Sequence, residues 1–394
     1  MPAPSTSALG LRIETARAAA RLSRRELAER SGVSPSMIQK VGDGRRAPSD
    51  QVLQALATAL GTTPEELLDG PGRTDSRVHH AIPELQRVIA AYDLPEDGPV
   101  RPLARIADDV ADGTQDRVQS QYVRLAEQSP MLLEELFRAV DQTRGCGQQE
   151  AARLLALAVR SADAVAYKHG YRDLSARLVE LMRWAAGIAD DPALTAASAY
   201  VRMETFFAAR QLAPGLRSLR AAVDRMPAPT TERLTAAAAA LHMRAAVAAG
   251  RMRQADDART HLREAAALAG QVRERLYDGT AVGPDSLEIH RLSVAVELGE
   301  EADLQEAVAA ATRWAPPRNL PAERRSHYYI DLGRAQMQLG RPQHAAESLL
   351  VARQIAPQHV REHGQVRAEL ATMVRLTSGR DERVLALARW AKAV

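Results

Sequence analysis

Cysteine is almost absent from this 394-residue sequence, in which Cys146 is the only one. A single cysteine cannot form an internal disulfide or a cysteine-based metal cluster, so we expect a protein of a reducing compartment. The sequence also has no apolar run close to the ~18 residues of a membrane-spanning helix. Its first ten residues, MPAPSTSALG, have neither the basic start nor the apolar stretch of a signal peptide. We therefore expect a soluble, cytoplasmic protein without a membrane partner.

Aromatic residues are scarce as well, at 4% of the sequence, although hydrophobic residues make up 46%. Alanine, leucine and arginine dominate instead. These residues have high helix propensities, whereas strands favour β-branched and aromatic residues. The sequence therefore predicts an all-α fold, with a small and a long domain because 394 residues exceed one ordinary core. The net charge is only +3, so a surface for nucleic acid has to come from local clustering of basic residues.

Residues 9–69 carry the signals of five short helices. An apolar face recurs every three or four residues in the first helix, and capping residues mark the start of the others. The start signals are the Ser23–Glu26 capping box, Ser34 with Pro35 in the first position, Ser49, and Thr63 with Pro64 and Glu66. Gly32 suits the left-handed conformation that ends a helix. A helix, a glycine turn and a second helix in this order predict a helix-turn-helix domain.

The stretch LSRRELAERSGVSPSMIQKVGDGRRAPS, residues 22–49, resembles helix-turn-helix regulators of the phage-repressor or xenobiotic-response-element (XRE) family. The resemblance covers residues 9–69. It implies that residues 1–69 are a DNA-binding domain whose third helix enters the major groove. Gly42 departs from the family pattern, in which a larger and often acidic residue is usual. We expect this glycine to fray the end of the third helix.

Basic residues cluster in the same segment, since residues 21–46 contain seven basic and three acidic side chains. Phosphate contacts supply affinity and orientation, whereas base contacts supply specificity. The predicted phosphate contacts are Arg24, Arg45 and Arg46, and the predicted base contacts are Ser36, Met37, Gln39 and Lys40, with Ser34 at the start of the same helix. Lys40 fits a guanine edge and Gln39 an adenine edge. The alternative is that these charges form an ordinary solvated helix surface.

Residues 70–82 contain glycine, proline and polar residues and are expected to form a linker. Residues 83–394 show helical patterns separated by short breaks, which predicts helical repeats. The unit at 326–357 resembles a tetratricopeptide repeat, with small residues at the helix crossing and a proline at its end. Weaker units are predicted at 164–187, 193–226, 241–270 and 285–314, and a loop at 277–286 interrupts one of them. Such helix pairs stack into an α-solenoid with a concave face.

The tetratricopeptide resemblance also implies which side chains line the concave face. They are His327, Arg334 and Gln338 in the clearest unit and, by the same register, Arg160, Tyr167, Lys168, Tyr200, Glu204, Phe207 and Arg244 in its neighbours. This groove is mainly basic with aromatic patches, and it suits an anionic small molecule, an acidic peptide or a protein partner. The alternative is that each residue belongs to ordinary helix surface or packing.

A helix-turn-helix head on tetratricopeptide repeats is similar to quorum-sensing regulators whose repeats bind short peptides. It is more similar to the repressor-headed regulators of actinobacteria. The resemblance to peptide-binding members implies groove asparagines that hold the peptide backbone, but Asn319 is the only asparagine in this sequence. The ligand therefore stays open between a small molecule, a peptide and a protein.

The segment HVREH, residues 359–363, has the H-x-x-E-H spacing of zinc peptidases. It follows Pro357, where a repeat would continue, so we expect an ordinary solvated helix and no metal site there. Neither a Walker-type loop nor a G-x-S-x-G elbow occurs in the sequence. We therefore expect no catalytic residues, no cofactor and no enzyme activity.

These observations predict a transcriptional regulator that binds double-stranded DNA as a homodimer. One head makes few base contacts, so two heads on an inverted repeat are expected to supply specificity. A ligand or partner in the repeat groove is expected to control DNA binding. The alternative is a protein-interaction scaffold whose head has lost DNA binding. The amphipathic terminal segment, residues 383–394, either caps the last repeat or contacts the other subunit.

Overall fold

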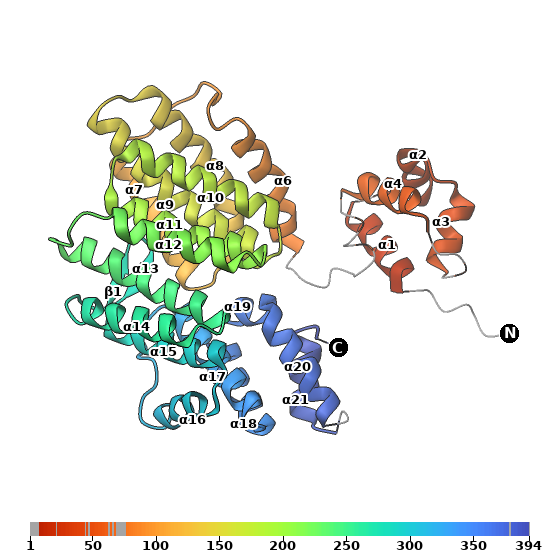
Figure 1. Cartoon of the computed structure of the whole chain (residues 1–394). Helices are drawn as coiled ribbons and strands as arrows, with labels where there is room; N and C mark the ends of the chain where they lie inside the picture. The colour runs from red at the N-terminus through yellow and green to blue at the C-terminus, as the bar shows by residue number, and fades with distance from the viewer. Residues whose placement is uncertain are drawn as a thin grey trace. The chain divides into compact units, whose positions relative to one another are not determined.

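The computed structural model describes residues 8–20, 22–43, 45, 48–61, 64, 67, 76–377 and 380–393 (Figure 1). The chain divides into two compact units, Met1–Ser76 and Arg77–Val394. We call them the head and the repeat domain. The described residues are mainly helical, which confirms the predicted all-α class, with one small β-hairpin in the repeat domain as the exception.

The described part of the head contains α1 (Ala8–Ala19), α2 (Arg24–Ser31), α3 (Pro35–Gly42) and α4 (Asp50–Leu60). The predicted caps are present. Ser23 and Glu26 form a reciprocal capping box at the start of α2, and the side chains of Ser34 and Ser49 accept amide hydrogen bonds at the starts of α3 and α4. Gly32 ends α2 with a left-handed φ of 66°.

The fifth predicted helix of the head lies mostly outside the described residues, because only Pro64 and Leu67 of it are described. Leu67 is 2% exposed and joins the core that Leu27, Ile38 and Leu56 form between α2, α3 and α4. The sequence pattern therefore places the apolar faces of these helices correctly.

Two glycines bring the backbones of α1 and α3 together. A Cβ atom on Gly10 would lie 1.9 Å from the carbonyl oxygen of Gly42. The helix α3 continues to Gly42, and the following amide of Asp43 donates to the carbonyls of Gln39 and Val41. The frayed end expected at Gly42 is thus wrong, because the helix is complete there and packs closely on α1.

The repeat domain consists of consecutive helices. They are α6 (Ser76–Ala90), α7 (Leu103–Val118), α8 (Tyr122–Gln142), α9 (Cys146–Lys168), α10 (Arg172–Ala189), α11 (Pro192–Ala208), α12 (Leu212–Arg225), α13 (Glu232–Arg251), α14 (Ala255–Ala269), α15 (Pro284–Leu298), α16 (Glu301–Ala310), α17 (Ala322–Gln338), α18 (Pro342–Ile355), α19 (Pro357–Glu362), α20 (Gly364–Leu376) and α21 (Glu382–Trp390). The five predicted repeat units fall on the pairs α9–α10, α11–α12, α13–α14, α15–α16 and α17–α18. In the clearest pair, a Cβ on Gly333 would lie 3.3 Å from the carbonyl of Ala345, so the small residue does permit the close crossing.

Three expectations for the repeat domain are changed or decided by the structure. The linker expected at 70–82 is wrong for its second half, because α6 begins at Ser76 and buries Val78 and Ile82. The loop expected at 277–286 contains the hairpin strands β1 (Arg275–Tyr277) and β2 (Thr280–Val282). The terminal helix α21 packs on α18 and α20, which fits the cap of the last repeat, the first of the two roles predicted for residues 383–394.

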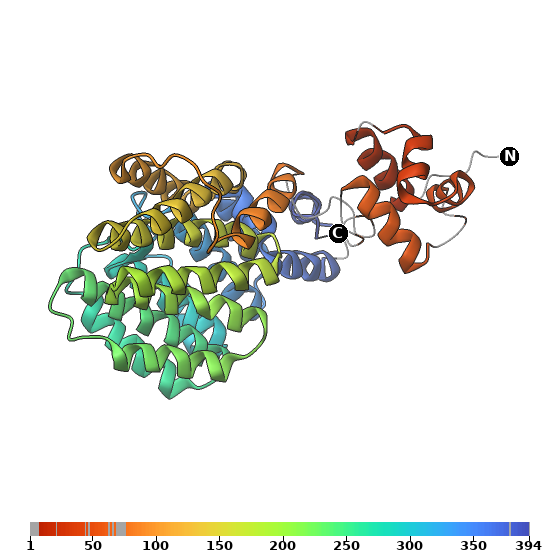
Figure 2. The ribbon, with the colours of Figure 1, turned by 90° about the horizontal axis from the view of Figure 1, so that it is seen from above.

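The inner helices α7, α9, α11, α13, α15 and α17 each contact the next, and α17 also contacts α7. The helix pairs follow one another around the domain in Figure 2, and the C-terminal helices return beside the N-terminal ones. The amide of Tyr122 on α8 donates to the side-chain oxygen of Gln358 on α19 over 3.0 Å. The repeat domain is therefore the predicted α-solenoid, and it curves until its last helices contact its first ones and close the domain. None of the helices in its described part, or in that of the head, is long and apolar enough to cross a membrane.

Candidate nucleic-acid interface and repeat interior

The helix α3 has one buried face and one exposed face. Ile38 and Val41 are 5% and 1% exposed and belong to the head core. Ser36, Gln39 and Lys40 are exposed, whereas Met37 is half-buried against the same core. Three of the four side chains predicted to contact bases are thus directed to solvent on one helix.

Two of the side chains predicted to contact phosphates, Arg24 and Arg45, lie at the start of α2 and after the end of α3. Arg24 is 75% exposed and forms an ion pair with Glu14 at 2.9 Å, and Arg45 is 64% exposed and lies 3.8 Å from Asp43. Exposed ion pairs of this kind contribute only about 0–1 kcal/mol, so a phosphate can replace either carboxylate at little cost. Ser34 is exposed, and its hydroxyl accepts the Met37 amide hydrogen bond at 3.3 Å. Arg46 lies outside the described residues.

In the repeat domain, the hairpin turn contacts two buried arginines. Arg117 on α7 donates to the carbonyl of Gly279, and Arg160 on α9 donates to the carbonyl of Asp278 and, at 2.8 Å, to the hydroxyl of Thr280. Arg160 is 6% exposed, and its burial, together with the nearby Arg117 charge, lowers the pKa of its guanidinium to about 9. The carbonyls of the turn therefore supply hydrogen bonds to two buried cations, of which Arg117 also lies 4.0 Å from Glu323.

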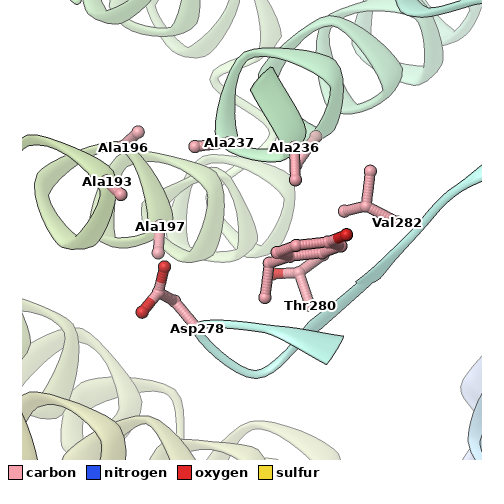
Figure 3. Close-up of a pocket in the computed structure, with 10 residues that line it drawn as sticks. Ala193, Ala196, Ala197, Ala236, Ala237, Asp278, Thr280 and Val282 are labelled. Atoms are coloured by element: carbon pink, nitrogen blue, oxygen red, sulfur yellow. The ribbon is translucent and has the colours of Figure 1, made fainter. Parts of the chain in front are cut away.

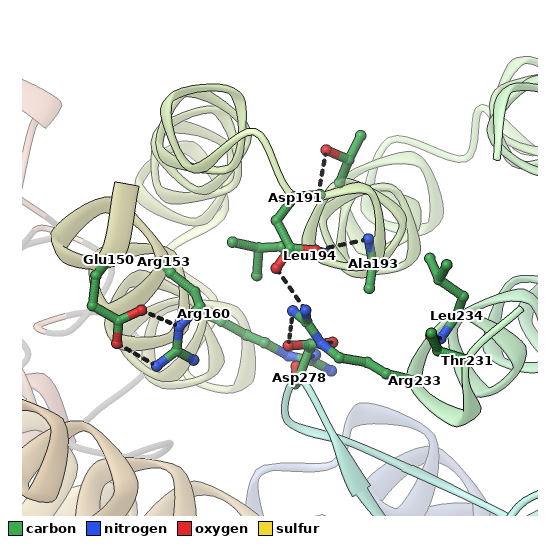
Figure 4. A network of polar contacts seen from close by, with 11 residues as sticks. Glu150, Arg153, Arg160, Asp191, Ala193, Leu194, Thr231, Arg233, Leu234 and Asp278 are labelled. Atoms are coloured by element: carbon green, nitrogen blue, oxygen red, sulfur yellow. Dashed lines mark hydrogen bonds and ion pairs between the residues drawn. The ribbon is translucent and has the colours of Figure 1, made fainter. Parts of the chain in front are cut away.

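An ion-pair network anchors this turn (Figure 4). Arg233 on α13 binds both carboxylate oxygens of Asp278, at 2.7 and 2.8 Å, and also contacts Asp191 at 2.6 Å. Arg233, Asp278 and Asp191 were not among the residues predicted from the sequence, although Asp278–Gly279 between two short β-forming segments is a hairpin signal. Both turn residues have positive φ values, 46° and 77°, as such a turn requires.

Tyr200 on α11 is the centre of a second group of inner side chains. It is 2% exposed, its hydroxyl accepts a hydrogen bond from Arg324 at 2.8 Å, and the guanidinium of Arg244 lies 3.9 Å from its ring centroid. Arg244 also pairs with Glu204 at 3.2 Å, and its guanidinium lies 5.8 Å from the ring centroid of Phe207. Four of the predicted groove residues thus form one mutually paired cluster.

Of the remaining predicted groove residues, Lys168, Arg334, Gln338 and His327 have polar partners and Tyr167 is half-buried. Lys168 lies 3.2 Å from Glu323, and burial raises the pKa of Tyr167 to about 12. Arg334 pairs with Glu297 at 3.2 Å, whereas Gln338 is exposed and bonds to the carbonyl of Val296. His327 lies 3.4 Å from Asp331.

The structure thus places the predicted groove residues on inner helices but does not show the open basic groove expected from the repeat pattern. Their side chains are mostly buried or half-buried and fill the space where the domain closes. The reason is the contact of α17 with α7, which brings Glu323 and Arg324 opposite Lys168 and Tyr200. The sequence of a single repeat does not predict this contact, because the register within one repeat does not determine the curvature of the whole array.

Two cavities lie near these elements. The first lies between the hairpin and the alanines of α11 and α13 and holds about 10 Å³, room for about one water molecule (Figure 3). The second holds about 500 Å³ between α7, α8 and α9, and the charged side chains in its wall include Arg101, Asp109, Arg138 and Glu135. The volume of the second cavity is in the range of small-molecule sites. Most of its lining residues lie between 101 and 138, where no repeat was predicted, and Ala158 and Ser161 of α9 complete it.

The HVREH segment is not the solvated helix expected from the sequence. The short helix α19 ends at Glu362, and His363 is extended before α20 begins. His359 is only 1% exposed. Glu362 is 8% exposed, and burial raises the pKa of its carboxyl group to about 7.

Comparisons with known proteins agree with the architecture of the head. A family model described as a helix-turn-helix domain matches residues 8–69, so this part of the chain is a helix-turn-helix domain. No curated protein matches the sequence. A solved structure of Bacillus thuringiensis PlcR in complex with the peptide PapR7 and DNA shows 13% identity over 66% of this chain and 93% of that chain. Its TM-score is 0.28, which is too low to support an argument about fold or ligand.

Proposed function

We propose that the protein is a sequence-specific DNA-binding transcription regulator, without enzyme activity, whose repeat domain controls the head. The observation that carries this proposal is the exposed polar face of α3 within a matched helix-turn-helix domain. In this class of domain the second helix of the motif lies in the major groove, where Lys40 and Gln39 reach base edges. Arg24 and Arg45 flank this face and hold phosphates.

The operator is an inverted repeat bound by two copies of the chain. One α3 helix reads only a few base pairs, and two heads on half-sites about one helical turn apart multiply the specificity. The repeat domain supplies the contact between the two copies. Equilibrium sedimentation with and without a duplex operator measures this stoichiometry.

The ligand of the repeat domain is an anion bound near Arg117 and Arg160. Both guanidinium groups now donate to neutral backbone carbonyls of the hairpin turn. A carboxylate or phosphate forms shorter and stronger hydrogen bonds with arginine than a carbonyl does, so an anionic ligand competes with the turn for these two side chains. Movement of the hairpin would change the packing of α7, α9 and α13. Coupling of this kind is typically worth ~1–3 kcal/mol, or about 5–150-fold in DNA affinity.

Selection of bound fragments from random DNA tests the first part of the proposal. We expect the wild-type protein to select an inverted repeat. Lys40→Ala should lose its preference at one base position, by ~1–3 kcal/mol. Arg45→Ala should lower the affinity for all sequences alike and reduce the salt dependence of binding. Arg105→Ala, an exposed arginine of the repeat domain, is the control and should bind as the wild type does.

Two results would contradict the proposal. Sequence-blind binding, or none, would support the alternative of an interaction scaffold with a non-binding head. Unchanged operator affinity for ligands that calorimetry shows to bind the repeat domain would exclude control by this domain.

A further inference from the structure

Three histidines meet where the last repeat joins the C-terminal helices. His327 lies on α17, His359 on α19, and His363 between α19 and α20. One ligand nitrogen from each ring lies within 4.8 Å of those of the other two. The ring centroids are 5.5 to 6.2 Å apart. Residues 36 positions apart in the chain thus present three imidazoles to one point.

Two of these rings have a buried nitrogen without a hydrogen-bond partner among the described residues. These atoms are Nε2 of His359 and Nδ1 of His363. A buried polar atom without a partner costs about 1–3 kcal/mol, and two such atoms within one cluster of imidazoles fit a shared bound ion. The other nitrogen of His359 lies 3.4 Å from the hydroxyl of Tyr122. This contact fixes the ring and leaves Nε2 for the cluster, in the way that outer partners orient metal-binding histidines.

Charged groups of both signs surround the three rings. Lys168 opposes a further cation, but Glu323 compensates its charge at 3.2 Å and Asp331 lies 3.4 Å from His327.

We propose that His327, His359 and His363 bind a divalent transition metal, with zinc as the occupant. Three imidazoles and one open position are a known zinc donor set, and imidazole suits late first-row metals in general. Zinc–nitrogen bonds of about 2.0–2.1 Å set tetrahedral donors about 3.4 Å apart. The donor atoms, at most 4.8 Å apart, therefore have to approach by at most about 1.4 Å.

None of the three histidines belongs to the head or to the hairpin, so the metal proposal does not depend on the proposed function. The metal joins α17 to α19 and α20, and through Tyr122 it connects these helices to α8. Its role is to stabilise the closed repeat domain. The HVREH spacing is thus a metal signal after all, but its glutamate is not one of the donors and its third ligand comes from another helix.

Zinc titration of the full-length protein, after removal of metals with a chelator, tests the proposal. We expect one equivalent of zinc to bind in competition with a chromophoric chelator and to raise the temperature of unfolding. His327→Gln, His359→Gln and His363→Gln should each weaken binding at least ~100-fold, because even loss of an outer-sphere partner costs about 10–100-fold. His344→Gln is the matched control, since His344 is exposed on α18.

Circular dichroism in the presence of chelator shows whether each variant is folded. His327→Gln is the most informative variant, because His327 is 32% exposed and its replacement disturbs packing least. The proposal is wrong if the wild-type protein takes up no stoichiometric zinc, or if folded His327→Gln and His363→Gln proteins bind zinc as tightly as His344→Gln does.

Discussion

The head and the repeat domain use charged side chains in opposite ways. In the head, Arg24 is 75% exposed and its ion pair is easily exchanged for another partner. In the repeat domain, Arg160 is 6% exposed and the Asp331 side chain 2%, and both are held by several partners. Exposed charges are available to DNA, whereas buried charges fix the arrangement of helices. The comparison teaches that abundance of arginine alone does not identify a binding surface.

Among the variants that test this comparison, Asp331→Ala should lower the free energy of unfolding the most. Asp331 accepts hydrogen bonds from Ser293 and from Arg334, the latter at 2.9 Å, so its removal leaves Arg334 with Glu297, 3.2 Å away, as its carboxylate partner. Loss of one partner of a buried charged group costs up to about 3–5 kcal/mol. Urea unfolding followed by helical circular dichroism, with chelator present, measures the loss.

The control is Asp303→Ala, which removes an exposed carboxylate that lies 3.1 Å from Arg259. A loss of less than about 1 kcal/mol is expected there, as for other exposed pairs. Equal losses for the two variants would contradict the distinction between buried and exposed charges.

Acid should destabilise the repeat domain before the head. All ten histidines lie outside residues 8–69. Burial, followed by the charge of Arg324, lowers the pKa of His290 to about 3. Because this folded pKa is below the unfolded value of 6.5, the stabilisation is complete above pH ~6.5 and is lost as the pH falls. The loss from His290 reaches about 2 kcal/mol at pH 5.

Hydrogen exchange at pH 7 and pH 5, corrected for the intrinsic rates, separates the two units in the intact chain. We expect faster opening of the repeat domain at pH 5 and little change in the head. His290→Gln should reduce the pH-dependent loss by about 2 kcal/mol. A head that opens as much as the repeat domain would show that the histidines are not responsible.

Gly10→Ala should weaken the head alone. The new methyl group would lie 1.9 Å from the carbonyl oxygen of Gly42, so α1 and α3 have to separate. Overpacking of this kind typically costs about 1–3 kcal/mol. Hydrogen exchange should show the loss in peptides of residues 8–61 and leave peptides of residues 76–377 unchanged. Unchanged protection of α1 and α3 would disprove the close packing of these helices.

Gly187→Ala is the smallest change and has the opposite sign. Gly187 is exposed in α10, and no atom lies within 4 Å of a Cβ added there. Alanine in a helix interior is more stable than glycine by roughly 0.5–1 kcal/mol. A higher urea midpoint of the repeat domain is the expected result, and a lower one would mean that this position is not an unstrained helical site.

The sequence predicts the head better than the repeat domain because its signals are local. Ser23 and Glu26 are three residues apart, and Ser34 bonds an amide three residues further on. Such pairs are visible in a short window of sequence. The buried and exposed faces of α3 follow from the helical period for the same reason. The five helix pairs of the repeat domain were also predicted, since each pair is a local unit.

The interior of the repeat domain depends on residues far apart in the chain. Arg160 and Asp278 are 118 positions apart, Tyr200 and Arg324 are 124 apart, and Tyr122 and His359 are 237 apart. No periodicity in one sequence reports such contacts, because they depend on the summed rotation of successive helix pairs. The same limit explains why HVREH was assigned to a solvated helix, since its burial is caused by α8 and α17.

The contact of α17 and α19 with α7 and α8 has a consequence for cooperativity. A linear array of repeats can lose its terminal units one after another, because each unit contacts only its neighbours. Here the last units also hold the first ones through polar contacts such as that of Tyr122 with Gln358, so separation of either end breaks hydrogen bonds at the other. The repeat domain should therefore unfold in one concerted transition. Cleavage of the backbone between any two helix pairs should destabilise both ends of the repeat domain.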